Sequence, residues 1–471
     1  MEHYSGKRRL LYANGHLGFS ILDNIFGVYL IFFLLPPAEL NMPQLVDNTP
    51  LFLGLTIVGL VIIFGRVVDS LADPLVAWWS DNARFRMGRR KFFLVTGAVP
   101  FALTSALLFF PPVAGESPMN AWYVAIVLGL YFFFYTYYMS PNLALIPEVS
   151  ANHQERISVT VSQAVFSIAG AGVVLMVVPM MWEGFESAGL STTGGFRMTM
   201  VVLAAIAALS MLLSAAPIDE KRFSKSAPAG VGLIESLKMT ISNSRFITYM
   251  VATILYWFGF HVIRAIIAYY PVVLLDRPPE FQTILMVALF GMAVLFFLLL
   301  PVLSKRFTNK QLMLAGMLSF AVLMVFTLVV GRLGALRTPL AIVHMGLMGF
   351  PVAVLLVIPN AAISDLSELD GYRTGKNREA MFFGTQGLFM KVNYGIAGAI
   401  TASLFAFFGK DAAEPLGVEL SGPVAAVFVL AGFLLLLRYP QNRINQELAE
   451  ARAAQEGSPG GASAGAGGSA E

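Results

Sequence analysis

Residues Phe64–Lys91 read FGRVVDSLADPLVAWWSDNARFRMGRRK. The apolar run Leu51–Phe64 leads into this stretch and is typical of a membrane helix, yet Arg66, Asp69 and Asp73 follow within the same predicted helix. At α-helical spacing the three charges lie within about 60° of one face. A charge in the bilayer core is costly unless it faces a protein interior or a watery cavity. We therefore expect this face to point into a helical bundle.

Two interpretations of this charged face remain open. Asp69 and Asp73 repel each other, and a monovalent cation bound between them would relieve the repulsion, which makes the face a candidate cation site. Alternatively, Arg66 and Asp69 form an internal ion pair that holds two helices together. One arginine neutralises only one of the two aspartates, and this favours the cation site.

The composition of the whole chain predicts a polytopic membrane protein. Of its 471 residues, 57% are apolar and 13% are charged, and the mean hydropathy is +0.72. The apolar runs are continuous, so α-helices are the expected spanning elements. The chain has no cysteine, which excludes disulfides and thiolate metal sites. No metal-ligand cluster, nucleophile motif or ATP-binding loop is visible, so we expect neither an enzyme nor a cofactor. A net charge of +3 gives no indication of nucleic-acid binding.

Apolar runs and polar breaks predict twelve spans in two groups of six. The expected division is an N-terminal half at 1–216, a central loop at 217–245, a C-terminal half at 246–438 and a disordered tail at 439–471. The predicted spans lie near 12–35, 51–80, 92–113, 121–146, 157–181, 196–216, 246–275, 281–303, 312–331, 338–363, 381–408 and 421–438.

Basic residues predict the orientation. If the N-terminus is cytoplasmic, 23 of the 31 Lys and Arg residues fall in cytoplasmic segments. We therefore expect both termini inside, and we interpret the first residues, MEHYSGKRRL, as a cytoplasmic start that is not a cleaved signal peptide. The expected location is the inner membrane of the cell, with the bilayer as the surrounding partner and a monomer as the working unit.

Several separated motifs resemble one family of transporters. They are RVVDSLADP from Arg66, LIPEVSANHQERIS from Leu145 and DLSELDGYRTGKNRE from Asp365, with Lys391 twelve residues beyond Glu379. Together they resemble the major facilitator superfamily and, more narrowly, its glycoside–pentoside–hexuronide:cation symporter branch. The resemblance implies an all-α membrane protein with the major facilitator fold, working by alternating access. A related branch, the sodium-coupled lysophospholipid symporters, has similar cation motifs.

The resemblance also implies roles for individual residues. Asp69 and Asp73 match the family's cation-binding aspartates, and Thr136 matches a threonine of the same site. Ala72 stands where the family has an asparagine, so one oxygen donor is missing and the choice between Na⁺ and H⁺ stays open. Asp23 matches an aspartate that binds sugar hydroxyls.

At two other sugar-contacting positions of the family, this chain has Met139 and Gln163, where the sugar branch has charged partners. Simple α-galactosides are therefore expected to bind poorly.

Three basic residues inside other spans extend the candidate site. Lys391 lies too deep to reach the interface and is either a structural counter-ion or a competitor of the cation for the aspartates; we favour coupling, together with Arg66. Arg264 and His261 share one helical face and could bind an anionic substrate group. Alternatively, Arg264 reaches the outer interface and His261 bonds a neighbouring carbonyl.

Charged residues at the cytoplasmic helix ends could form a gate between the halves. They are expected to pair when the transporter faces outward, although a solvated rim is the simpler alternative. The candidates are Glu148, Arg156, Asp365, Glu368, Arg373 and Arg378.

The sequence thus predicts a cation-coupled symporter of a sugar, glycoside or related small solute. The alternative is a sodium-coupled transporter of a lysophospholipid or another amphiphilic anion.

Overall fold

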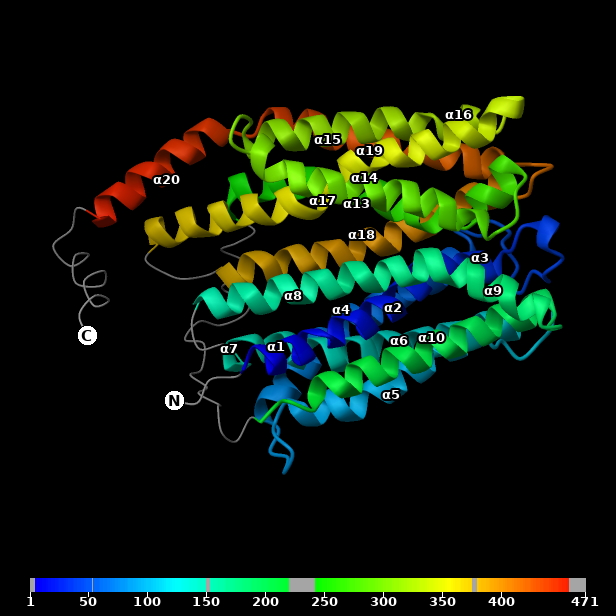
Figure 1. Cartoon of the computed structure of the whole chain (residues 1–471), viewed down its shortest axis with the longest axis horizontal. Coiled ribbons are helices and arrows are strands. Elements are labelled where there is room, and N and C mark those ends of the chain that lie inside the picture. Colours follow the sequence, from blue (N-terminus) through cyan, green and yellow to red (C-terminus); the bar gives the residue numbers. More distant parts are fainter. Residues whose placement is uncertain (1–4, 53, 150–152, 220–241, 375–378, 457–471) are drawn as a thin grey trace.

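A computed structural model of the chain describes residues 5–52, 54–149, 153–219, 242–374 and 379–456. Its helices run side by side in two groups, one built from α1–α10 and the other from α13–α20 (Figure 1). The start of α1 and the helix α20 lie at the same end of the bundle, which we call the terminal end; α3, α9 and α16 lie at the opposite, distal end (Figure 1).

The N-terminal half begins with one long span that a π-helical turn interrupts. This span, 6–34, consists of α1, α2, a π-helical turn η1 and α3. The elements of this half are α1 Gly6–Ala13, α2 Gly15–Asn24, η1 Ile25–Tyr29, α3 Leu30–Leu34, η2 Ala38–Leu40, α4 Ile57–Asn82, α5 Lys91–Leu107, α6 Pro118–Ala144, α7 Ile146–Val149, α8 His153–Gly172, η3 Val173–Val177, α9 Val178–Ser187 and α10 Thr192–Ala215.

The C-terminal half contains the longest helix, α17, with 38 residues. Its elements are α13 Ser244–Ile266, η4 Tyr270–Leu274, α14 Phe281–Leu303, α15 Asn309–Val325, α16 Thr327–Val330, η5 Gly334–Leu336, α17 Arg337–Thr374, α18 Glu379–Phe408, α19 Leu416–Leu437 and α20 Gln441–Glu456.

The described helices account for the twelve predicted spans. Ten helical segments are long and apolar enough to cross a membrane, and α5 is apolar but shorter. The remaining span is α4, which has 26 residues and contains the charges Arg66, Asp69 and Asp73. The all-α architecture expected from the sequence is therefore present in the described part of the chain.

The second span begins later than the sequence indicated. A helix was expected from Leu51, but α4 begins at Ile57, because the Thr56 side chain accepts a hydrogen bond from the Gly59 amide at 3.2 Å and caps the helix there. The preceding apolar residues form a turn closed by a bridge between Pro50 and Thr56, in which Gly54 adopts a positive φ of 77°.

The tail also differs from the expectation of disorder from residue 439. Residues Gln441–Glu456 form α20, and the buried side chains of Ile444 and Leu448 attach this helix to the C-terminal half. The tail residues 457–471 and most of the predicted central loop, 220–241, lie outside the described residues.

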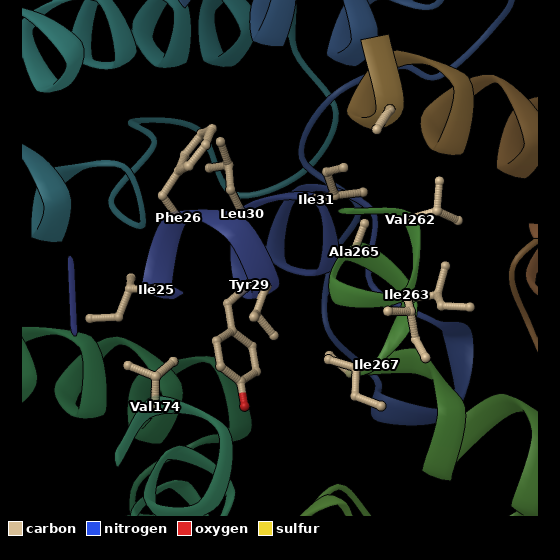
Figure 2. Packing of buried hydrophobic residues seen from close by; sticks show 14 of the residues in the cluster. Ile25, Phe26, Tyr29, Leu30, Ile31, Val174, Val262, Ile263, Ala265 and Ile267 are labelled. Carbon is tan, nitrogen blue, oxygen red and sulfur yellow. The ribbon is translucent and has the colours of Figure 1, made fainter. Parts of the chain in front are cut away.

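One apolar core spans both halves. Figure 2 shows Ile31 of α3 beside Ala265 and Val262 of α13, with Phe26 and Leu30 farther along the same N-terminal span. Towards the distal end, hydrogen bonds also join the halves: the Gln282 amide donates to the Tyr29 hydroxyl oxygen at 3.0 Å, and Lys410 donates to the Pro36 carbonyl at 2.7 Å. The halves are therefore held together on that side.

Candidate cation and substrate sites

Three helices from both halves bring the predicted cation residues together. Asp69 and Asp73 come from α4, Thr136 from α6 and Lys391 from α18. The Lys391 ammonium lies 2.8 Å from Asp69 Oδ1 and 2.7 Å from Asp73 Oδ2. Thr136 Oγ1 lies 2.9 Å from one oxygen of each aspartate. Hydroxyls carry one proton, so Thr136 donates to one carboxylate at a time.

Arg66 completes this cluster from the other side of Asp69. Its Nη1 donates to Asp69 Oδ2 at 3.2 Å, one helical turn away on α4. The guanidinium carbon lies 4.4 Å from the ring centre of Phe132 and 4.0 Å from that of Tyr394. Arginine stacks favourably on aromatic faces, so these rings hold Arg66 in place. The ion pair proposed as the alternative role of Arg66 is present. The contacts of Lys391 with both aspartates are those expected of Lys391 both as a structural counter-ion and as a competitor of the cation.

The cluster is electrically balanced as it stands. Two carboxylates face two cations, and Asp69 is fully buried while the Asp73 side chain is 41% exposed. A cation that binds both carboxylates must therefore displace Lys391, because the ammonium already occupies three of their four oxygens. Asp69, Asp73 and Thr136 offer only hard oxygen donors, which suit an alkali cation or a proton and not a soft metal.

A second, partly buried ion pair joins the halves. Arg264 on α13 donates through Nη2 to Asp23 Oδ2 at 2.8 Å and also to the Asp23 backbone carbonyl on α2. Arg264 therefore does not reach the outer interface, which the sequence left open. Asp23 neutralises its charge, so an anionic ligand is not needed to balance it.

The pair Asp23–Arg264 lines a cavity of about 340 Å³ between the halves. Polar groups of Asn24 and Ser167 lie on the N-terminal side, and α13 contributes Trp257. The rest of the wall is largely apolar. It consists of Ile168, Ala171, Leu175, Phe260, Ile263, Ile267, Met286, Leu289, Phe290, Val352 and Leu356.

Two donors beside this cavity lack partners among the described residues. They are Trp257 Nε1 and Arg264 Nε, and both atoms are buried. A buried donor without an acceptor costs about 1–3 kcal/mol, so both groups favour a ligand that supplies hydroxyl or ether oxygens.

Three predicted substrate residues lie elsewhere. Gln163 on α8 and Met139 on α6 are not among the described residues lining the large cavity. His261 lies instead beside a much smaller space, with its ring centre 4.6 Å from that of Tyr394. Its two nitrogens are without hydrogen-bond partners among the described residues, so the alternative in which His261 bonds a neighbouring carbonyl is not present there.

The sequence did not single out Asn24, Ser167, Trp257 or Tyr394. Trp257 lies seven residues before Arg264 on α13 and therefore shares its face, which is a signal the sequence offered. Asn24 directly follows Asp23 but points about 100° away from it around α2, so helical spacing gave no signal for it. Tyr394 lies one turn beyond Lys391. The residues on either side of Tyr394 carry no charge, and a tyrosine within an apolar span is ordinary packing by its hydropathy, so the sequence held no signal for a functional role of Tyr394.

Two of the described gate candidates, Arg373 and Asp365, have contacts within the C-terminal half. Arg373 forms an ion pair with Glu447 of α20, and Asp365 accepts a hydrogen bond from Asn309 at 3.4 Å. Glu368 lies near them on α17. Arg378 lies outside the described residues, and for Glu148 and Arg156 only the backbone is described. Pairing across the halves at this end therefore stays a prediction.

Comparison with known proteins supports a transporter. A family model described as MFS/sugar transport protein matches residues 11–443. An uncharacterised symporter of Synechocystis is 24% identical over 94% of this chain and 95% of its own length. An isoprimeverose transporter of Lactiplantibacillus pentosus is 22% identical, covering 83% of this chain and 82% of its own.

Solved structures support the fold. A nucleoside transporter aligns with a TM-score of 0.64 over 92% of this chain and 99% of its own, at 11% identity. A D-xylose–proton symporter aligns with a TM-score of 0.59 over 90% and 97%, at 14% identity.

Proposed function

Because the chain belongs to the MFS/sugar transport protein family, we propose that it is a cation-coupled symporter of a sugar or glycoside. The observation that carries this proposal is the cluster of Lys391, Asp69, Asp73 and Thr136, which spans both halves of the bundle. The chain is an integral membrane transporter and not an enzyme, because its family and its relatives are membrane transporters.

Coupling follows from competition for the two carboxylates. When a monovalent cation binds Asp69 and Asp73, Lys391 must leave, and the ion pairs that link α18 to α4 across the halves are lost. When the cation leaves, Lys391 returns and the halves reconnect. Na⁺ is the proposed cation because five oxygens are available from two carboxylates and one hydroxyl, with H⁺ as the alternative since Ala72 supplies no oxygen.

The substrate occupies the cavity beside Asp23 and Arg264. Their charges cancel, which favours a neutral solute over an anion. Asp23 accepts hydrogen bonds from hydroxyls, and the indole of Trp257 donates one. A cavity of about 340 Å³ falls within the range of small-ligand sites. Lactose permease of Leuconostoc lactis, 25% identical over 83% of this chain and 61% of its own length, bears a sugar in its name and supports the same substrate class.

The hydrogen bonds at the distal end support access from the terminal end. Together with the distribution of basic residues, they favour a state that opens to the cytoplasm, with both termini inside. The bacterial relatives support a place in the inner membrane. We propose that the monomer is the working unit, because both sites are formed within one chain.

The apolar wall of the cavity favours a second candidate, an amphiphile such as a lysophospholipid. Leu289, Phe290 and Leu356 could accommodate an acyl chain that a free sugar would not need. The neutral Asp23–Arg264 pair argues against it, since a phosphate would have to displace Asp23.

Uptake into proteoliposomes tests the function. Lactose, isoprimeverose, melibiose and lysophosphatidylcholine are offered under an inward Na⁺ gradient, under an inward H⁺ gradient and without either. We expect accumulation of at least one sugar that requires a cation gradient, and loss of that accumulation in Asp69→Asn. Gradient-driven uptake of the lysolipid alone would establish the second candidate instead. Sugar uptake that ignores both gradients would contradict coupling.

A further inference from the structure

The cation cluster and the substrate pair meet at one aromatic side chain. Arg66 belongs to the first and contacts Asp69; Arg264 belongs to the second and contacts Asp23. The ring centre of Tyr394 lies 4.0 Å from the Arg66 guanidinium carbon and 5.5 Å from that of Arg264. One ring therefore interacts with a cation from each site, and both interactions depend on where the ring lies.

The surroundings of Tyr394 leave it little freedom. The ring stacks on Phe26 at 5.5 Å with an interplanar angle of 24°, and His261 lies 4.6 Å away on another side. A methyl group on Gly27 would come within 2.3 Å of both the Tyr394 hydroxyl and the Arg264 guanidinium carbon. Only glycine lets these two groups approach η1 together. A displacement of the Tyr394 ring therefore shifts the Arg264 guanidinium that packs beside it over Gly27.

Tyr394 shares its helix with the residue that the cation displaces. Lys391 lies three positions earlier on α18, so the two side chains occupy neighbouring places on one face. α18 also packs tightly on α4 here, because a methyl group on Gly395 would lie only 3.2 Å from Arg66 Cγ. A movement of α18 that withdraws Lys391 from Asp69 and Asp73 carries the Tyr394 ring with it.

We propose that Tyr394 is the positioning residue that transmits cation binding to the substrate cavity. This inference rests on the proposed symport. When the cation displaces Lys391, α18 shifts, the ring of Tyr394 moves against Arg264, and the Asp23–Arg264 pair loosens so that Asp23 accepts a sugar hydroxyl. The contact of α18 with α4 has two arrangements, one with Lys391 on the aspartates and one with Lys391 withdrawn. The cation and the sugar both favour the second arrangement, and this shared preference is the physical requirement for coupling.

Trp257 provides a readout that needs no sugar. It lines the same cavity as Arg264, and its ring centre lies 5.8 Å from that of His261. The experiment records tryptophan fluorescence of the full-length protein during titration with Na⁺ and, separately, with protons. Subtraction of the trace of Trp257→Phe isolates the signal of this residue, while ²²Na⁺ retention or proton uptake measures cation binding directly.

We expect a cation-dependent change at Trp257 in the wild type. Tyr394→Leu should lose this change although ²²Na⁺ retention or proton uptake shows that the cation still binds. Tyr394→Phe, which keeps the ring, should retain the change. Tyr123→Leu, a half-buried tyrosine of α6 that donates to the Leu107 carbonyl, is the matched control and should behave as wild type.

Several outcomes would overturn the proposal. One is a normal Trp257 fluorescence change in Tyr394→Leu. Another is that Tyr394→Phe loses this change as completely as Tyr394→Leu does. The third is that the wild type shows no cation-dependent change at all. If Tyr394→Leu does not fold, the comparison of Tyr394→Phe with Gly27→Ala decides: only Gly27→Ala should weaken the signal. Gradient-driven sugar uptake by the wild type would still establish symport in each case, so failure of this inference and failure of the proposed function are distinguishable.

Discussion

Replacement of Lys391 tests the competition at the centre of the cation site. Its ammonium lies 2.7–2.8 Å from three carboxylate oxygens, so Lys391→Ala leaves Asp69 and Asp73 with only Arg66 as a counter-charge. One negative charge is then in excess. A cation no longer has to displace an ammonium, and its affinity should rise while the coupling to transport is lost.

The size of the effect follows from the geometry. Coulomb's law gives about 4 kcal/mol for unit charges about 4 Å apart at an effective dielectric constant of about 20. The net effect is smaller, because a displaced Lys391 regains hydration and the Asp73 side chain is 41% exposed. A net contribution of about 1.5–3 kcal/mol is typical of hydrogen bonds to charged groups. The cation should therefore bind about ten- to 150-fold more tightly to the variant.

The assay combines ²²Na⁺ binding in detergent with sugar accumulation in proteoliposomes and thermal melting. Lys310→Ala is the control, since this lysine donates to the carbonyls of Leu437 and Tyr439 within the C-terminal half and takes no part in the cluster. Tighter Na⁺ binding with failed accumulation and a folded protein is the expected result. Weaker Na⁺ binding in a well-folded Lys391→Ala would refute the competition, and a general loss of folding would assign Lys391 a purely structural role.

Three further predictions concern the other charged contacts. Asp69→Asn and Asp73→Asn should each abolish cation-driven uptake while the protein remains folded and inserted, and normal uptake by both, measured in proteoliposomes, would refute the cation site. Arg264→Ala should lower thermal stability because the partly buried Asp23 loses its counter-charge, at a cost below the about 3–5 kcal/mol that is typical of breaking a fully buried pair. The double variant Arg264→Ala with Asp23→Ala should recover part of this loss, and melting curves with no recovery would show that the pair is not coupled. Hydrogen bonds from Arg245 hold the pKa of Glu447 down to about 2, aided by the charge of Arg373, so the stabilisation of α20 is complete above about pH 4.3 and is lost as the pH falls towards 2. Hydrogen exchange in residues 441–456 should therefore show equal protection at pH 8 and pH 5 in the wild type and reduced protection in Glu447→Gln, and a pH-dependent wild type in this range would contradict the assignment.

The spans could be located from the sequence because hydropathy reports what a membrane helix must bury. Their ends could not, since an apolar run looks the same in a helix and in a turn. At Leu51 the deciding feature is the Thr56 cap, a single side-chain contact that hydropathy does not register. The helix α20 was not predicted because its composition is polar. Its stability depends on the docking of Ile444 and on the contact of Glu447 with Arg245, both of which are tertiary.

The cation cluster could be predicted because its aspartates share one helical face and the family motifs fix their partners. The ion pair Asp23–Arg264 joins residues 241 positions apart, and no local pattern relates them. The sequence placed both residues near the substrate but did not pair their charges. Arg264 was therefore expected to bind an anionic ligand. The position of Tyr394 between two arginines likewise depends on how α4, α13 and α18 meet, and periodicity within one helix does not contain this information.

The most direct test of the central claim is a structure of the protein determined by electron cryomicroscopy in Na⁺ and in a Na⁺-free buffer at the same pH. In Na⁺, we predict density between the carboxylates of Asp69 and Asp73 and the hydroxyl of Thr136, with the Lys391 ammonium withdrawn from both aspartates. In the Na⁺-free state, Lys391 should contact both carboxylates, as it does here. A Na⁺-bound structure in which Lys391 still contacts Asp69 and Asp73, with the ion held elsewhere, would contradict the competition.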